Sequence, residues 1–248
     1  MSSIALYTDL SGYYDLMCAD INYREQSEYV QRVNSLFGNG GKRCLDLGCG
    51  TGPHVRHFID FGFEASGLDI HAPMLDIARQ RNPEANFFQD DMSSFTTAEP
   101  FDLITIFLYS IHYNQSITKL AECISSVHAA LSAGGIFCFN SVDKTAITNK
   151  RGMRHTTTTY KGSEFTFSSN WYYVGHGDEQ QLQVRVEKTT NGVTEIWQDV
   201  HAMVAVNFQF ILELLVPFFE VHVFEHVFDR IEPWDGLSGN AIFFCVKK

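Results

Sequence analysis

The chain has 248 residues, of which 45% are hydrophobic and 19% charged, a balance typical of a globular protein with an ample core. Its net charge of −11 makes the surface as a whole a poor partner for a nucleic-acid backbone. No stretch reaches the roughly 18–20 uninterrupted apolar residues of a membrane helix.

The first residues contain no basic region and soon reach an acid, Asp9, so we do not expect a secretory signal. The six cysteines form no CxxC pair, and several lie in apolar runs that look like strands. We therefore expect reduced thiols in the core of a cytoplasmic protein that has no membrane attachment.

An amphipathic helix is predicted within the first 40 residues, where YREQSEYVQRVNSLF has helical spacing of apolar side chains and ends at a glycine-rich stop. Short apolar strands then alternate with helices. The expected strands are 43–47, 64–68, 86–88, 101–108 and 136–140, and the expected helices are 53–61, 73–80 and 117–131. This alternation predicts a mostly parallel sheet covered on both faces, which binds ligands where the strand order reverses.

The pattern changes after residue 140. Stretches such as QLQVRVEK and TEIWQDVHAMVAV alternate with period two, and Asn191-Gly192 between them is a strong hairpin signal. We expect an antiparallel insert of three or four strands, then a helix and two closing strands. The predicted division is a helical lid over 1–40, an α/β domain over 41–145 and 206–248, and a substrate cap over 146–205.

The stretch LDLGCGTG ends the first expected strand with three closely spaced glycines. A dinucleotide fingerprint would need its third glycine at the place of Pro53. The turn still lets a ligand approach the backbone, because glycine has no Cβ. Asp46, inside the strand, would repel phosphates but could accept hydrogen bonds from a cationic ligand.

Acids also stand at the ends of the next two strands. Asp69 suits a pair of ribose hydroxyls, or it caps the following helix. Asp91 with Met92 could bond an adenine amino group and cover the ring, or these could be solvated turn residues.

Together, LDLGCGTG, GLDI with Met74, QDDM, FDLITIFLYSIHY and LSAGGIF resemble the class I S-adenosylmethionine-dependent methyltransferases over about residues 42–140 and the closing strands. The resemblance implies a doubly wound, seven-stranded Rossmann-like sheet. It implies S-adenosylmethionine as the methyl donor and S-adenosylhomocysteine as the product. The residues it implies at the cofactor are Tyr14, Tyr23, Asp46, Gly48, Cys49, Gly50, Gly52, Asp69, Ile70, Met74, Asp91, Met92 and Leu108.

A narrower similarity concerns SGYYDLMCADINYREQSEYV, SIHY and EPWDGLSGNAIFFCVKK. These stretches are similar to small-molecule N-methyltransferases, including the enzymes that dimethylate amino sugars. In that family Tyr14 and Tyr23 would approach the cofactor from the lid, although both could equally pack within it.

Methyl transfer from a sulfonium is an in-line displacement, for which the protein mainly supplies alignment and a dry cavity. A neutral amine attacks directly, whereas a hydroxyl usually needs a base or a metal. His112 is the candidate to accept a proton, with a core histidine as the alternative. Tyr109 and Tyr14 could orient the acceptor or hold its ammonium group by a cation–π contact, or they could line a wall.

The expected function is methylation of a small molecule at an amine nitrogen. The alternatives are O- or C-methylation, a non-catalytic S-adenosylmethionine-binding protein, and an NAD-dependent oxidoreductase, against which the glycine spacing and Asp46 argue. No metal is expected, because the pairs His54/His57 and His222/His226 lack a third ligand. The insert strands could pair across a homodimer or cap the pocket of one chain.

Overall fold

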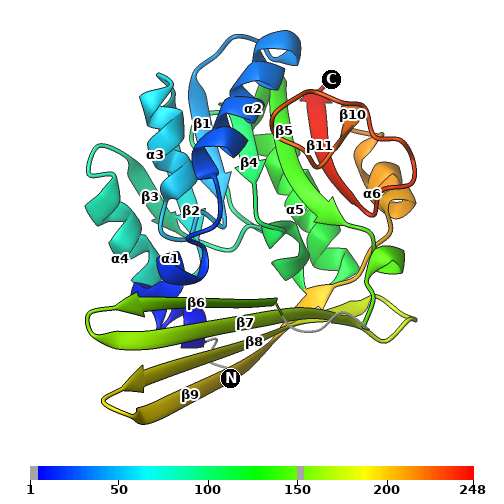
Figure 1. Ribbon diagram of the computed structural model, residues 1–248. Helices are drawn as coiled ribbons and strands as arrows, with labels where there is room; N and C mark the ends of the chain where they lie inside the picture. Colours follow the sequence, from blue (N-terminus) through cyan, green and yellow to red (C-terminus); the bar gives the residue numbers. More distant parts are fainter. Residues whose placement is uncertain (1–4, 150–153) are drawn as a thin grey trace.

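The computed structural model describes residues 5–149 and 154–248 and consists of two sheets with flanking helices (Figure 1). Residues 1–4 of the predicted lid and 150–153 of the predicted cap lie outside the described residues. The strands are β1 Arg43–Leu47, β2 Glu64–Asp69, β3 Asn86–Gln89, β4 Phe101–Ile106, β5 Leu131–Val142, β6 Arg154–Tyr160, β7 Ser163–Tyr173, β8 Glu179–Thr190, β9 Val193–Val204, β10 Phe219–Glu225 and β11 Asn240–Lys247. The α-helices are α1 Tyr14–Met17, α2 Tyr23–Phe37, α3 Pro53–Asp60, α4 Ala72–Arg81, α5 Ile117–Ala130 and α6 Phe208–Leu215, and the 3₁₀ turns are η1 Ala5–Tyr7, η2 Ser11–Tyr13, η3 Ser110–Asn114 and η4 Lys144–Ala146.

The larger sheet has seven strands in the order β10-β11-β5-β4-β1-β2-β3. Strands β3, β2, β1, β4 and β5 are parallel, and β11 and β10 complete the sheet in the antiparallel sense. The mostly parallel, doubly wound sheet predicted from the sequence is confirmed. After β3 the chain crosses to the other side of β1, so the order reverses between β1 and β4.

Helices cover both faces of this sheet because its inner strands are apolar on both sides. On β4, Ile104 and Ile106 belong to the core beneath α5 and α6, whereas Leu103 belongs to the core beneath α2 and α3. This burial on both faces is why FDLITIFL reads as a continuous apolar run.

Strand β5 begins earlier than the sequence pattern indicates. We predicted a strand over 136–140 after a helix ending at a glycine pair, but α5 ends at Ala130 and β5 follows without a break. The pairing of β4 with β5 shifts register after Phe101, and Gly134 in this irregular segment has a φ of +68°. The glycine therefore serves a bulge in the strand and not a helix stop.

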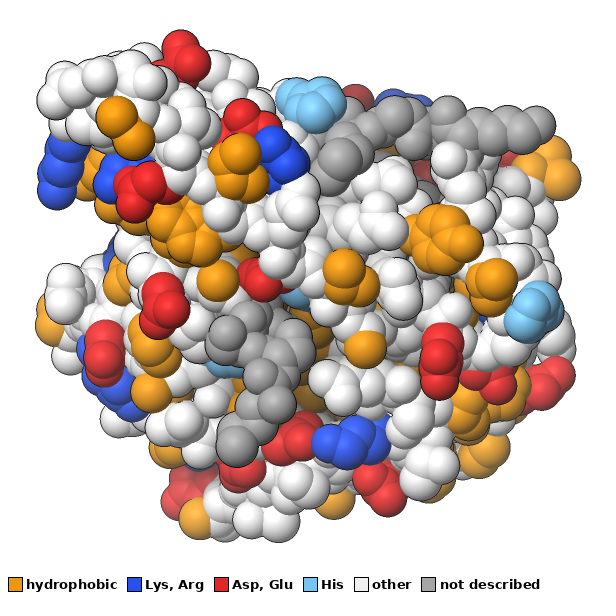
Figure 2. Space-filling view, turned by 90° about the horizontal axis from the view of Figure 1, so that it is seen from below, with side chains coloured by type: hydrophobic (Ala, Val, Ile, Leu, Met, Phe, Trp, Pro, Cys, Tyr) orange, Lys and Arg blue, Asp and Glu red, His pale blue; other side chains and the backbone are white. Residues whose placement is uncertain are grey.

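The smaller sheet has the order β6-β7-β8-β9 and is antiparallel throughout, which confirms the predicted insert with four strands. It lies beyond the carboxyl ends of the parallel strands (Figure 1). One face packs against the N-terminal turns, where Phe165 and Phe167 meet Leu6 and Leu10. On the face seen in Figure 2, hydrophobic side chains are scattered among polar ones. A homodimer through the insert stays a prediction.

All six cysteines lie in the described part of the chain, where each is buried and none forms a disulfide. Over the same residues, none of the helices combines the length and the apolar character that crossing a bilayer requires.

Gly52 and Gly62 offer a matched test of how closely α3 packs. Both have a positive φ, +76° and +82°. A Cβ at Gly52 would lie 2.8 Å from Nδ2 of Asn82 and 3.1 Å from Cβ of Ala78, whereas one at Gly62 would meet nothing within 4 Å. Gly62→Ala should lower the free energy of unfolding by about 1–2 kcal/mol, the cost of the left-handed backbone. Gly52→Ala should lower it by about 2–5 kcal/mol, because overpacking adds to that cost. Equal losses in urea titrations would contradict this packing.

Candidate active site

The turn after β1 exposes bare backbone at the carboxyl edge of the sheet, where the strand order reverses. Gly48 and Gly50 have φ values of +64° and +54°, in the left-handed region that favours glycine. A Cβ at Gly48 would lie 3.2 Å from Cβ of Ser110, and one at Gly50 would lie 3.4 Å from Cε of Met74. Side chains at these positions would fill the space beside the turn, so the glycines keep it open for a ligand.

Two adjoining cavities lie against this turn. The larger has a volume of about 310 Å³, within the usual range of small-molecule sites. The predicted cofactor residues that line it are Tyr14, Gly48, Gly50, Asp69, Ile70, Met74, Asp91 and Met92. The smaller, of about 20 Å³, shares Tyr14, Gly48 and Gly50 with the first and is also lined by Tyr23, Asp46, Cys49 and Leu108.

Gly52 is the one predicted cofactor residue that lines neither cavity. It precedes α3 and packs against α4, with its carbonyl accepting a hydrogen bond from Nδ2 of Asn82 at 3.0 Å. The third glycine therefore serves close helix packing. The binding roles of the other predicted residues stay predictions.

Asp46 is the most deeply buried acid at the site, with 2% of its surface exposed. Its Oδ1 accepts a hydrogen bond from Oγ1 of Thr105 at 2.7 Å. Burial and the nearby charge of Asp69 together raise the pKa of Asp46 to about 7, although the hydrogen bond from Thr105 lowers it. A cationic group in the smaller cavity would favour the ionised carboxylate.

Asp69 joins the ends of two neighbouring strands. One carboxylate oxygen accepts the N–H of Gly50 at 2.9 Å, and the other accepts the N–H of His71 at 2.8 Å. Burial raises the pKa of Asp69, and these two backbone bonds oppose that rise. Each oxygen keeps acceptor capacity beyond one hydrogen bond, so the carboxylate can also accept from a ligand in the larger cavity.

Asp91 is held in place at the end of β3. Its Oδ1 accepts the N–H and the hydroxyl of Ser93 at 2.9 and 2.8 Å, and its Oδ2 pairs with Nζ of Lys119 at 3.1 Å. These bonds from Ser93 and Lys119 lower the pKa of Asp91, against the effect of its partial burial. The following residue, Met92, lies on the wall of the cavity near Gly48.

Hydrogen bonds and an ion pair of Asp15 connect the N-terminal segment that contains α1 to the glycine turn. Oδ1 of Asp15 accepts the hydroxyl of Thr51 at 2.6 Å, and Asp15 forms an ion pair with Arg81 of α4. Nη1 of Arg81 also donates to the carbonyl of Thr51 at 2.8 Å. These contacts of Asp15 hold its neighbour, Tyr14, at the larger cavity.

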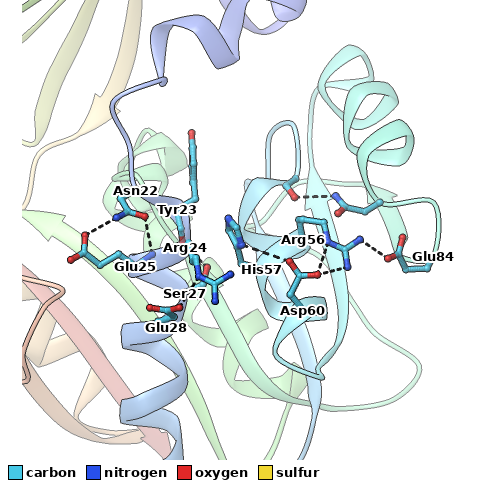
Figure 3. Close-up of polar contacts among 12 residues, drawn as sticks. Asn22, Tyr23, Arg24, Glu25, Ser27, Glu28, Arg56, His57, Asp60 and Glu84 are labelled. Atoms are coloured by element: carbon cyan, nitrogen blue, oxygen red, sulfur yellow. Dashed lines mark hydrogen bonds and ion pairs between the residues drawn. The ribbon is translucent and has the colours of Figure 1, made fainter.

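Tyr23 reaches the smaller cavity from the first turn of α2 (Figure 3). The helix starts there because Oδ1 of Asn22 accepts the N–H of Glu25 at 3.1 Å, which is an N-cap. Figure 3 also shows Arg56 of α3 between Asp60 and Glu84, two exposed ion pairs outside the cavities.

Comparisons with known proteins agree with this arrangement. Residues 44–135 match the family model described as "Methyltransferase domain". A dTDP-3-amino-3,4,6-trideoxy-alpha-D-glucopyranose N,N-dimethyltransferase from Streptomyces venezuelae is 34% identical over 93 residues, 37% of this chain and 39% of that protein. The resemblance to the class I S-adenosylmethionine-dependent methyltransferases predicted from the sequence is confirmed.

Solved structures share the fold of this protein over nearly the whole chain. DesVI from Streptomyces venezuelae has a TM-score of 0.83 at 20% identity and covers 97% of this chain and 99% of its own. The sugar N-methyltransferase KedS8 from Streptoalloteichus sp. ATCC 53650 has a TM-score of 0.81 at 20% identity, covering 100% and 94%. By sequence, the chain spans about half the length of the curated relatives it matches, or less: 56%, 39% and 45% of the first three.

Tyr109 lines neither cavity. Its hydroxyl accepts a hydrogen bond from Nδ2 of Asn240 at 2.7 Å, and its ring lies 5.7 Å from those of His226 and Trp171. Leu108 and Tyr109 have φ values of 51° and 62°, an uncommon backbone for such side chains. The predicted contact of Tyr109 with the acceptor is not supported by this placement, whereas Tyr14 does lie at the cavity.

His112 is completely buried, and both of its ring nitrogens are engaged. Nε2 accepts the N–H of Val142 at 3.2 Å, so the proton is on Nδ1, which donates to the carbonyl of Val204 at 2.9 Å. Burial lowers the pKa of His112 to about 4. The predicted proton-accepting role is not supported, because the imidazole lines neither cavity and joins η3 to β5 and β9.

The larger cavity also has lining residues that the sequence analysis missed: Tyr7, His71, Ser110, Tyr113, Gln115 and Lys119. Tyr113 stands directly beside His112 in SIHY, so the pattern indicated the right segment. Which of its side chains faces the cavity depends on the turn of η3, which buries Ile111 and His112 in the core.

The histidine pairs considered for metal binding have other contacts. Nε2 of His54 lies 2.9 Å from Oε1 of Gln26, and Nε2 of His226 lies 3.0 Å from Nδ2 of Asn140. Within 5–149 and 154–248, no three or more His, Cys, Asp or Glu side chains are grouped to hold a metal ion.

If His112 is a structural residue, its removal should act on stability. His112→Ala should lower the free energy of unfolding by about 2–4 kcal/mol at pH 7.5, because it leaves Val142 and Val204 without partners and opens a cavity. The folded pKa of about 4 is below the unfolded value, so this contribution is present above about pH 6.5 and is lost as the pH falls towards 4. Urea titrations of both proteins at several pH values measure it.

His176→Ala, at an exposed histidine in the turn before β8, is the control and should cost less than about 1 kcal/mol. If the His112→Ala protein kept the wild-type stability but lost its turnover, His112 would act in the reaction and not in the structure.

Proposed function

We propose that this methyltransferase transfers the methyl group of S-adenosylmethionine to an amine nitrogen of a small molecule. The observation that carries the proposal is the cavity itself. It brings the glycine turn, Asp69, Asp91 and Met92 together where the strand order reverses, beneath an antiparallel sheet. The sugar N-methyltransferase KedS8 has the same fold over the whole chain.

The residues present fit this cofactor. Buried Asp46 is an acceptor that a cationic amino-acid group would help to ionise, and Asp69 has acceptor capacity for ribose hydroxyls. Asp91 and Met92 at the end of β3 suit the adenine ring. A Cβ on Gly48 would lie 3.2 Å from Cβ of Ser110 and 3.6 Å from Cε of Met92, so the glycine keeps the space beside Met92 open.

When bound, the sulfonium supplies the methyl group: the nitrogen lone pair forms the C–N bond while the electrons of the C–S bond stay with sulfur, which yields S-adenosylhomocysteine. The chain's own residues align the two reactants and exclude water from the cavity. Tyr14, held in place by the contacts of Asp15, lines the larger cavity from the N-terminal segment.

Nitrogen is proposed as the acceptor atom for two reasons. Matched relatives include N,N-dimethyltransferases named for dTDP-linked amino sugars. In addition, a neutral amine needs no base to attack, and His112, the residue predicted as a base, is occupied by structural bonds. An amine on a sugar nucleotide is therefore the first acceptor class to test.

The buried, unbridged cysteines fit a reducing compartment, so the proposal places the protein in the cytoplasm. The acidic surface fits a small-molecule acceptor better than a nucleic acid.

Calorimetric titration with S-adenosylmethionine, S-adenosylhomocysteine and NAD tests the cofactor. Micromolar binding of the first two, with none of NAD, is expected. Amino-sugar nucleotides and the matching hydroxy-sugar nucleotides should then be compared as acceptors by the release of S-adenosylhomocysteine. Turnover of the hydroxy compounds alone would change the proposed acceptor atom to oxygen. Cofactor binding without turnover of any acceptor would favour a non-catalytic protein. Binding of NAD alone would overturn the proposal.

The buried carboxyl of Asp46 predicts a pH dependence of cofactor affinity. Its pKa in the empty site is about 7, and an ammonium group of the ligand would lower it, so binding should release a proton below pH 7. The affinity for S-adenosylhomocysteine should therefore rise with pH, by up to about tenfold per unit, and level off above about pH 7.5. Titrations in two buffers of different ionisation enthalpy measure the released proton.

Asp46→Asn should abolish this dependence and weaken binding at pH 8 by about 1–3 kcal/mol. Asp60→Asn, on an exposed ion pair of α3, is the control and should keep the wild-type profile. A wild-type affinity that does not change between pH 6 and 8 would show that Asp46 does not meet a charged group.

A further inference from the structure

Three side chains from distant parts of the sequence, of which His201 is buried and the two tyrosines half-buried, form a chain of hydrogen bonds at the larger cavity. The hydroxyl of Tyr7 lies 2.7 Å from that of Tyr113, and the latter lies 2.6 Å from Nδ1 of His201. Tyr7 belongs to η1 in the lid, Tyr113 to η3 after β4, and His201 to β9 of the insert. The chain of bonds therefore joins all three predicted parts of the molecule.

The first two members face the cavity near Asp69. Tyr7 and Tyr113 both line it, and the charge of Asp69 adds to burial in raising the pKa of each hydroxyl. The ring of Tyr7 lies 5.4 Å from that of His71, whose N–H is bonded to Asp69. The two tyrosine hydroxyls are thus close to the carboxylate proposed to bind the ribose.

The bonding pattern has two possible directions, and His201 selects between them. Burial lowers the pKa of His201 to about 4, so its ring is neutral, and its buried Nε2 has no hydrogen-bond partner. A proton on Nε2 would be a buried donor without an acceptor, which proteins avoid more strongly than a bare lone pair. The proton therefore belongs on Nδ1.

With the proton on Nδ1, each hydroxyl has one partner to donate to. His201 donates to the oxygen of Tyr113, Tyr113 donates to the oxygen of Tyr7, and the hydrogen of Tyr7 is left to point into the cavity. A ribose diol has two hydroxyl hydrogens, which a carboxylate can accept, and two oxygens that can accept from a donor. Asp69 can accept from the hydroxyl hydrogens, but a carboxylate cannot donate to the ribose oxygens.

We propose that the hydroxyl of Tyr7 donates a hydrogen bond to a ribose oxygen of the bound cofactor, and that Tyr113 and His201 are positioning residues that set the direction of this donor. The inference rests on the proposed function and extends it by a binding residue from the lid. It also makes β9 of the insert part of the cofactor site, through His201.

The test pairs a missing hydroxyl on the protein with a missing hydroxyl on the ligand. Binding of S-adenosylhomocysteine and of its 2′-deoxy and 3′-deoxy analogues is measured by calorimetry for the wild type and for Tyr7→Phe. Tyr7→Phe keeps the ring and should weaken binding of S-adenosylhomocysteine by about 5–30-fold. One deoxy analogue, which binds the wild type more weakly, should lose little further affinity in Tyr7→Phe, because the two deletions remove the same hydrogen bond.

Tyr113→Phe breaks the chain of bonds at its centre and should show the same non-additivity with a smaller loss, of about 2–10-fold. Tyr13→Phe is the matched control, because that ring packs on Phe165 of the insert at 4.7 Å and does not line the larger cavity. It should bind all three ligands as the wild type does.

Equal affinity of Tyr7→Phe and the wild type for S-adenosylhomocysteine would overturn the inference. So would an equal loss for all three ligands, which would show that Tyr7 acts through packing alone. If the wild type itself does not bind S-adenosylhomocysteine, the proposed function fails first, and the two failures are therefore distinguishable.

Discussion

The carboxylate of Asp69 ties the turn after β1 to the turn after β2 through the N–H groups of Gly50 and His71. The rest of the site depends on this tie. It holds the glycine backbone against the end of the next strand, and it keeps a buried acceptor at the edge of the larger cavity. Because parallel strands end at the same edge, groups after β1, β2, β3 and β4 then meet in one place.

Two segments outside the seven-stranded sheet lie at its carboxyl edge, and Tyr7 and Tyr14 of the first segment line the larger cavity. Asp15 connects the N-terminal segment that contains α1 to Thr51 and Arg81, and the four-stranded sheet lies beyond the carboxyl edge (Figure 1). Tyr7, Tyr113 and His201 connect these layers by short hydrogen bonds. Such a buried polar connection stabilises only the arrangement in which every donor has its acceptor, so it specifies how lid and insert sit over the site.

His112 shows how a polar residue in the expected segment can serve architecture. Its neutral imidazole accepts from Val142 and donates to Val204, which joins β5 to the end of the insert. An imidazole with both nitrogens bonded in the interior has no free site for a proton. Aligning a neutral amine with a sulfonium requires shape more than acid–base chemistry, so a site without this base is consistent with N-methylation.

The sequence by itself determined the order of strands and helices, the antiparallel insert, the position of Asp46 inside the first strand and those of Asp69 and Asp91 at the ends of the next two. These features depend on local periodicity and on residues that immediately follow a strand. It could not determine which side chain of SIHY faces the cavity, that Gly52 serves helix packing, or that β5 starts at Leu131. Tertiary structure decided these points, because they depend on which neighbours approach from elsewhere in the chain: Asn82 beside Gly52, Val142 beside His112, and Tyr7 beside Tyr113. Contacts between residues far apart in the sequence leave no periodic signal, and one of these three, between Tyr7 and Tyr113, forms part of the wall around the proposed cofactor.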